Sequence, residues 1–130
     1  MKILVGYKGS DVGKDLMDTA VKHAKAFDGH ILIVTSMVSG DKAEAQKIVD
    51  AEKNLEQAKA YFSDFGVKSD THLLIRGFEP GEDIVNFARE MKVDEIIIGV
   101  RSRSKVGKLI FGSTAQIVIL DSHCPVLTVK

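Results

Sequence analysis

The clearest pattern in the chain is a series of five short apolar segments, most of them continuous and rich in β-branched residues. A segment that is apolar at every position is typical of a strand buried on both faces. The five segments are Ile3–Val5, Ile31–Val34, Leu73–Ile75, Ile96–Ile98 and Val126–Val129. Strands of this kind occur in parallel sheets covered by helices, so we expect a five-stranded parallel sheet.

The first two gaps between these segments have helical spacing. In the first gap, apolar side chains recur on one face of a helix, at Val12, Leu16, Ala20, Ala24 and Phe27. The second gap has a longer stripe, at Ile48, Ala51, Leu55, Ala58, Phe62 and Phe65. Steps of three and four residues are typical of an amphipathic helix, so we expect both stripes to face the core.

Two further helices complete the alternation. Pro80 fits the first turn of a third helix, whose apolar side chains are Ile84, Ala88 and Met91. A fourth helix begins near Ser113, where Ser113 and Gln116 have the spacing of a capping box, and it ends before Pro125. This order predicts an α/β fold, with one doubly wound domain over residues 1–130 and right-handed crossovers.

The composition is that of an ordinary soluble domain and limits the partners. Of the 130 residues, 45% are hydrophobic and 28% are charged. The 18 basic side chains balance the 18 acidic ones, so any anion site must be local. The chain has no Trp, which argues against an aromatic platform for single-stranded nucleic acid. We expect neither a nucleic-acid partner nor a membrane partner.

The cysteine content and the N-terminus indicate a cytoplasmic protein. Cys124 is the only cysteine, so an internal disulfide and a cysteine-rich metal site are both excluded. The first residues run straight into a strand-like segment without a signal peptide, and no apolar run approaches the ~20 residues that span a bilayer.

Candidate chemistry lies where the first and fourth strands end. Ligands of open α/β sheets bind at the carboxyl ends of strands, where the strand order reverses. Gly6–Ser10 follows the first strand, and Gly99–Lys108 follows the fourth. The second of these loops carries four basic residues and no acid, and Gly112–Thr114 then opens the last helix. A helix N-terminus favours anions, which indicates a phosphate site. A solvated basic loop with an ordinary helix cap explains the same residues equally well.

The common phosphate-binding motifs are absent. A P-loop requires Gly-x-x-x-x-Gly-Lys-Ser/Thr. At Gly107-Lys108 the first Gly would be Ser102 and the last position is Leu109. No Gly-x-Gly-x-x-Gly follows the first strand, so a dinucleotide fingerprint is also missing.

Several segments together resemble the universal stress protein family along essentially the whole chain. Nucleotide-binding members carry Gly-x-x-Gly, nine further residues and Gly-Ser. Gly99–Ser102 and Gly112-Ser113 reproduce this spacing, with Ser102 in place of the second Gly. The strand before the motif, Asp94–Ile98, the terminal Cys124–Val129 and the start Ile3–Ser10 also have the family's form.

The resemblance implies a particular architecture and ligand. The sheet would have the order 3-2-1-4-5 with helices on both faces, as in adenine nucleotide alpha hydrolase-like folds. The crevice between strands 1 and 4 would bind ATP or AMP, with or without magnesium. A homodimer would form through the last strand. The residues implied at the nucleotide site are Gly6, Tyr7, Lys8, Ser36, Gly99, Val100, Arg101, Ser102, Arg103, Gly112, Ser113 and Thr114.

Two departures from the family pattern leave two hypotheses open. Lys8 stands where the family usually has an acid, and a lysine side chain has no hydrogen-bond acceptor for ribose or adenine. Ser102 adds a side chain where the family has Gly. Under the first hypothesis the chain binds an adenine nucleotide in a regulatory role. Under the second it binds no nucleotide and acts as a dimeric interaction protein.

The remaining polar residues have structural interpretations. Glu79, Glu82 and Asp83 surround Pro80, and we interpret them as acids that favour the positive end of a helix. The four histidines do not have metal-ligand spacing, and Cys124 is better interpreted as a small core residue than as a nucleophile. We therefore expect no catalytic residues and no metal site.

Overall fold

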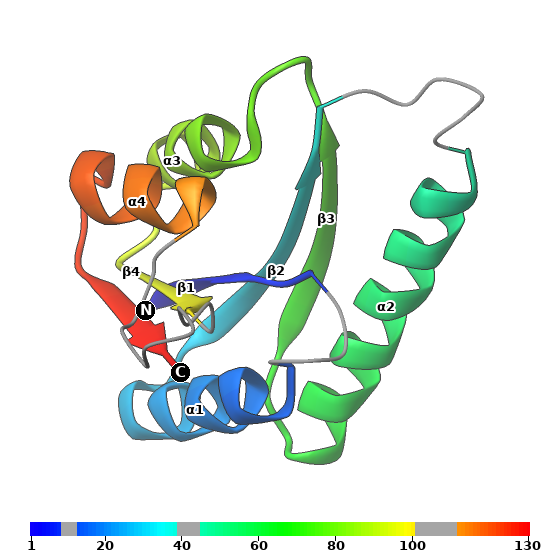
Figure 1. The fold of residues 1–130 in the computed structure, drawn as a ribbon. Coiled ribbons are helices and arrows are strands. Elements are labelled where there is room, and N and C mark those ends of the chain that lie inside the picture. The colour runs from blue at the N-terminus through cyan, green and yellow to red at the C-terminus, as the bar shows by residue number, and fades with distance from the viewer. Residues whose placement is uncertain (9–12, 39–44, 101–111) are drawn as a thin grey trace, which may run out of the picture.

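The computed structural model describes residues 1–8, 13–38, 45–100 and 112–130 (Figure 1). Strands and helices alternate along the chain as the sequence predicts. The strands are β1 (Lys2–Gly6), β2 (His30–Met37), β3 (Ser69–Ile75), β4 (Glu95–Gly99) and β5 (Val126–Val129). The helices are α1 (Gly13–Phe27), α2 (Ala45–Asp64), α3 (Pro80–Glu90) and α4 (Ser113–Asp121).

All five strands form one parallel sheet in the order β3-β2-β1-β4-β5. This is the predicted order. β1 lies in the centre, where Leu4 pairs with Leu32 of β2 on one side and with Ile96 of β4 on the other. The connection from β1 leads toward β2, whereas the connection from β3 crosses to β4, so the strand order reverses between β1 and β4.

The continuous apolar runs contribute side chains to two separate hydrophobic cores, one on each face of the sheet. On one face, Ile3 and Val5 pack with residues of α1 and α2. On the other face, Leu4 packs with residues of α3 and α4. Because successive side chains of a strand point to opposite faces, a strand covered on both sides must be apolar at every position. The two-layer arrangement of helices is visible in Figure 1.

The predicted helical stripes are wrong at their C-terminal ends. Phe27 is 56% exposed and Phe65 is 44% exposed, although both continue the spacing of core positions. Phe65 lies just beyond the end of α2, where its ring contacts Tyr61 and the Lys25 ammonium group lies 5.6 Å from its centre. The spacing correctly predicted which face of each helix turns toward the sheet. It could not show how far along the helix that face is covered, because this depends on where the sheet beneath it ends.

The two outermost strands are less buried than their sequences suggest. Only Leu74 of β3 is buried, and β5 has no fully buried residue. Within the described part of the chain, each of these strands pairs on one side only. Among the four helices of the described residues, none is both long and apolar enough to cross a membrane.

Candidate functional site

The reversal of strand order brings two predicted glycines to the same edge of the sheet. Gly6 ends β1 and pairs with Ile98, and Gly99 ends β4 one residue later. A Cβ atom on Gly6 would lie 3.1 Å from Cγ2 of Ile98. The backbone of β1 therefore approaches its neighbour closely at the point where a ligand crevice is expected.

Tyr7 and Lys8 follow β1 directly, and the first is buried whereas the second is exposed. Tyr7 is 6% exposed, and its backbone N–H donates to the Val34 carbonyl at 2.9 Å. Its ring lies against Gly13, where a Cβ atom would be 3.1 Å from Cε1, and burial raises the pKa of the Tyr7 hydroxyl. Lys8 is exposed, so its charge is available at this edge.

Gly99 and Val100 continue the sheet. Gly99 pairs with Val129, and the Val100 N–H donates to the Val129 carbonyl at 2.6 Å. The Val100 side chain is buried with the core of α3 and α4. Its contribution to a ligand site would therefore come from the backbone. The predicted site residues Arg101, Ser102 and Arg103 lie outside the described residues, as do the other basic residues of that loop.

The start of α4 differs from the capping box that the sequence predicts. The N-cap is Gly112, which has extended φ and ψ of −65° and 166° and no side chain to accept a hydrogen bond. Ser113 is the first helical residue and is exposed, and Thr114 is half-buried. The predicted cap is wrong because the helix begins one residue earlier than a Ser113 cap requires. As a consequence, the Ser113 hydroxyl is exposed at the helix N-terminus, which favours anions.

Ser36 is half-buried near the end of β2, on the strand face that turns toward α3. Its Oγ donates to Oδ2 of Asp83 at 2.7 Å. Asp83 lies in the first turn of α3 and is completely buried. A buried charge requires partners, and Asp83 has a second one in Arg76.

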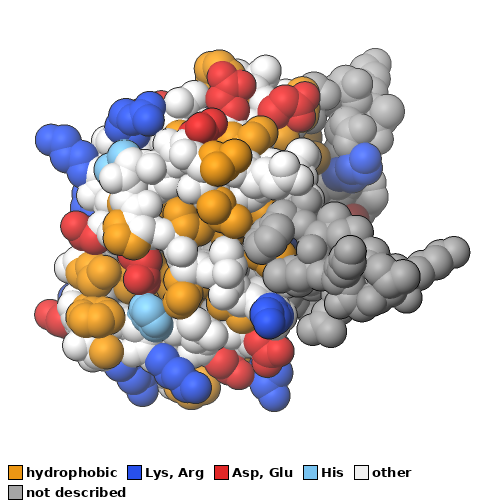
Figure 2. Space-filling view, turned by 60° about the vertical axis from the view of Figure 1, so that its left-hand side comes forward, with side chains coloured by type: hydrophobic (Ala, Val, Ile, Leu, Met, Phe, Trp, Pro, Cys, Tyr) orange, Lys and Arg blue, Asp and Glu red, His pale blue; other side chains and the backbone are white. Residues whose placement is uncertain are grey.

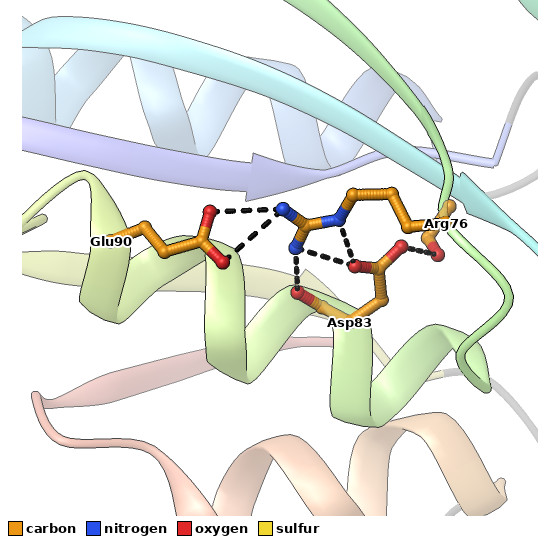
Figure 3. Close-up of polar contacts among 4 residues, drawn as sticks. Arg76, Asp83 and Glu90 are labelled. Carbon is orange, nitrogen blue, oxygen red and sulfur yellow. Dashed lines mark hydrogen bonds and ion pairs between the residues drawn. The ribbon is translucent and has the colours of Figure 1, made fainter.

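Arg76 follows β3 and bridges two acids of α3 (Figure 3). Its Nε donates to Oδ1 of Asp83 at 2.7 Å, and its Nη1 donates to Glu90 at 2.9 Å. Burial alone would lower the pKa of Arg76, but the hydrogen bonds with Glu90 and Asp83 outweigh it and raise that pKa. The guanidinium thus stays charged and neutralises the buried carboxylate.

This cluster corrects the interpretation of Asp83 as a simple helix-end charge. A signal for it was present in the sequence. Asp83 lies one turn before Phe87 on the buried face of α3, so the helical spacing places an acid at a core position. Its partners could not be found in this way, because Arg76 and Ser36 lie on different elements.

Three histidines of the described residues have a polar partner nearby. Nδ1 of His23 lies 2.9 Å from Glu95, and Nε2 of His30 lies 2.7 Å from Asp70. Nε2 of His123 lies 3.1 Å from the Val93 carbonyl oxygen. Within the described ranges, no three His, Cys, Asp or Glu residues gather closely enough to hold a metal ion.

A groove of about 670 Å³ lies between α3 and α4, away from the ends of β1 and β4. None of its lining residues was predicted as a site residue. The lining comprises Glu82, Val85, Asn86, Arg89, Ile117, Leu120 and Asp121.

Comparison with protein families gives one match over the full chain. The sequence pattern described as the "Universal stress protein family" matches residues 1–130. A universal stress protein of Methanocaldococcus jannaschii is 31% identical over 140 residues, which cover 99% of this chain and 81% of that protein. One from Thermus aquaticus is 32% identical, covering 98% of this chain and 97% of the relative.

Solved structures are similar over the full length as well. A universal stress protein from Archaeoglobus fulgidus has a TM-score of 0.92 and 37% identity, covering 100% of this chain and 98% of that one. A second structure from the same organism, a complex with dAMP, has a TM-score of 0.86 and 33% identity at the same coverage. The likeness extends through the strands and helices that form the candidate crevice.

Proposed function

The chain belongs to the universal stress protein family, and from this premise we propose that it is a regulatory module that binds an adenine nucleotide where β1 and β4 end. The observation that carries the proposal is the match over the whole chain to a relative solved with dAMP. The pairing of β1 with β4 supports it, since this pairing brings Gly6 and Gly99 to one edge. We also propose that residues 1–130 form one universal stress protein domain.

Each part of the nucleotide would meet a different group of residues. The phosphates would lie at the N-terminus of α4, where backbone N–H groups and the helix dipole favour negative charge. The ends of β1 and β2 would frame the adenine and the ribose. The proposed phosphate side comprises Gly99, Val100, Arg101, Ser102, Arg103, Gly112, Ser113 and Thr114. The proposed nucleoside side comprises Gly6, Tyr7 and Ser36, whereas Lys8, at the same end of β1, would pair with a phosphate as a point charge.

Lys8 suits a phosphate better than a ribose. Its ammonium group is exposed at the carboxyl edge of β1 and donates hydrogen bonds only. The nucleotide would be ATP or AMP, with or without magnesium. A regulatory rather than enzymatic role and a cytoplasmic location are part of the same proposal.

The test is calorimetric titration of nucleotide-stripped protein with ATP, AMP and dAMP, each with and without magnesium. We expect saturable binding. Ser113→Asp should abolish it, because the substitution places an acid where the phosphate would lie. Ser63→Asp is a matched control at an exposed position of α2, and it should bind as the wild type does. Unchanged affinity of Ser113→Asp would remove the start of α4 from the site.

A second candidate function is supported by the edge of the sheet at β5. β5 pairs only with β4, so its other edge has unpaired backbone groups among the described residues. On the neighbouring helix, Leu120 is 79% exposed and Ile119 is 39% exposed. Figure 2 turns this side of the molecule toward the viewer and shows hydrophobic side chains scattered between polar ones. These features favour a protein that acts as a homodimer through β5. Folded protein that gives no binding heat at any temperature would favour this candidate alone.

A further inference from the structure

The outward face of α4 is apolar, where a surface helix is usually polar. Residues Ile117–Leu120 are all apolar, and four successive residues complete more than one helical turn, so their side chains point to every side of α4. Of the four, only Val118 is buried. Leu120 is 79% exposed, the largest fraction among the large apolar side chains of the described residues. A helix that is apolar on all sides is typical of one that a partner covers.

The groove between α3 and α4 adjoins this apolar face. The two helices lie side by side over one face of the sheet (Figure 1). Val85 lines the groove from α3, and Ile117 and Leu120 line it from α4. Val85 is buried and Ile117 is half-buried, so they supply an apolar floor, whereas the exposed Leu120 lies on the rim. The groove is therefore suited to an apolar side chain that enters from another molecule.

Two charges of opposite sign line the α3 side of the groove. Glu82 and Arg89 are seven residues apart, which is about 10.5 Å along one face of the helix. Both are exposed, and neither forms an ion pair or a side-chain hydrogen bond with another described residue. A two-fold axis at the midpoint, beside Val85 and Asn86, exchanges the two positions. Two copies packed antiparallel would then set each Glu82 against the Arg89 of the other copy.

We propose that the groove and the apolar face of α4 form a docking surface for a second copy of this chain, in which α3 packs antiparallel to α3 and α4 to α4. The charges favour this occupant, because a surface that is complementary to itself needs opposite charges at equal distances from its two-fold axis. Two Glu82–Arg89 ion pairs would flank the contact, and Leu120 of each copy would cover apolar surface of the other. The surface is separate from the edge of β5 and requires no bound nucleotide.

The association through this surface is weak. Two helices of 11 and 9 residues present less surface than a stable dimer interface contains. We expect a Kd on the order of 100 μM. Pairing through α3 and α4 would thus occur in concentrated protein and be lost on dilution.

The experiment is sedimentation velocity of Thr128→Pro protein without nucleotide, from about 10 μM to about 1 mM, which brackets the expected Kd. The proline removes an N–H from the open edge of β5, so this background isolates the surface of α3 and α4. The average mass should rise from that of a monomer toward that of a dimer. Leu120→Gln should raise the Kd about tenfold, because a polar side chain replaces the apolar anchor. Val49→Gln is the matched control at a 55% exposed position of α2, and it should leave the Kd unchanged.

Charge reversal tests the pairing of Glu82 with Arg89. Arg89→Glu alone would set acids against acids, and Glu82→Arg alone would set bases against bases, so each should raise the Kd by about tenfold or more. An equimolar mixture of the two variants should associate with about the Kd of the parent, because each face then meets opposite charges. Both positions are exposed, so the variants should keep the fold, which circular dichroism checks. The same series in the wild-type background decides the question if Thr128→Pro does not fold.

Three results would each overturn the proposal. The first is folded Thr128→Pro protein that stays monomeric up to about 1 mM. The second is a Leu120→Gln variant that associates as strongly as its parent. The third is a mixture of Arg89→Glu and Glu82→Arg that associates no better than either variant alone, which would show that these charges do not face each other. Because no nucleotide is present, none of these results changes the case for the proposed function.

Discussion

Asp83 and Glu90 lie on one helix and bind the same arginine, but they differ in how much the stability of the fold depends on each ion pair. Asp83 is buried and its charge depends on Arg76 and Ser36. The Glu90 side chain is 54% exposed, so water stabilises its charge without help from Arg76. Removing a partner from a buried charge is strongly destabilising, whereas an exposed ion pair contributes little.

We therefore expect Arg76→Met to lower the free energy of unfolding by about 3 kcal/mol, because it leaves the Asp83 carboxylate buried beside an apolar chain. Glu90→Gln should lower it by at most about 1 kcal/mol. Urea denaturation of both variants measures the difference. Equal losses would show that Asp83 is not the group that depends on Arg76.

His72 gives the fold a pH dependence with a definite sign. Its ring packs 5.0 Å from the ring of Phe87, between centroids. Burial lowers the pKa of His72 below 6.5, while Asp70 acts to raise it and His30 to lower it further. The unfolded chain therefore binds the proton more readily than the folded chain. The stability that the fold gains by burying neutral His72 is fully present above about pH 6.5, and it is lost as the pH falls through the folded-state pKa.

His72→Gln removes this titrating group. We expect the wild type to lose more stability than His72→Gln between pH 7.5 and pH 5, as measured by urea midpoints at both values. The pairs His23–Glu95 and His30–Asp70 remain in both proteins, so the difference isolates His72. Parallel pH profiles would contradict the assignment.

At the scale of elements, the spacing of α3 and α4 is set where Gly81 meets α4. A Cβ atom on Gly81 would lie 2.9 Å from Cβ of Ile117 and 3.1 Å from the Thr114 carbonyl oxygen. Neither atom is the flexible end of a side chain, so a larger residue must push the helices apart. Thr114 lies in the first turn of α4, where we propose that phosphate binds.

Gly81→Ala should thus destabilise the protein although alanine favours helices. Overpacking costs about 1–3 kcal/mol, and the gain in helix propensity is about 1 kcal/mol. We expect a net loss of about 1 kcal/mol in thermal or urea unfolding, together with weaker AMP binding. Gly112→Ser is the contrast, because no atom of the described residues lies within 4 Å of its Cβ position and serine is a good N-cap. Its stability should equal or exceed that of the wild type.

At the scale of the whole molecule, the outer edge of β5, which has no partner strand among the described residues, is the feature most suited to self-association. The Pro125 and Val129 carbonyls bond to β4, so by alternation the backbone groups of Val126 and Thr128 point to the open side. An unpaired edge of this kind is a template for a second strand. A homodimer through β5 would satisfy these groups.

Thr128→Pro tests this arrangement, because proline removes an N–H that points away from β4. We expect the wild type to be a dimer by light scattering coupled to size exclusion, and the variant to be a monomer with the fold retained. A wild type that is monomeric at high concentration would contradict dimerisation through β5. A variant that remains dimeric would place the interface elsewhere.

The sequence by itself determined the alternation of strands and helices, because a strand buried on both faces must be apolar throughout and a covered helix must be apolar on one side. It also identified the glycines at the ends of β1 and β4. The resemblance to a family supplied the strand order and the proposed ligand. These features depend on local periodicity or on motifs with fixed spacing, which a single chain displays directly.

The tertiary structure alone decided which side chains share a neighbourhood. The predicted cap at Ser113 moved to Gly112, and the predicted core residues Phe27 and Phe65 are exposed, because contacts at element ends are not periodic. Ser36, Arg76 and Asp83 come from β2, the end of β3 and α3, and nothing in their separations along the chain marks them as partners. A buried charge selects its partners by distance in space, and packing of the sheet against α3 sets that distance.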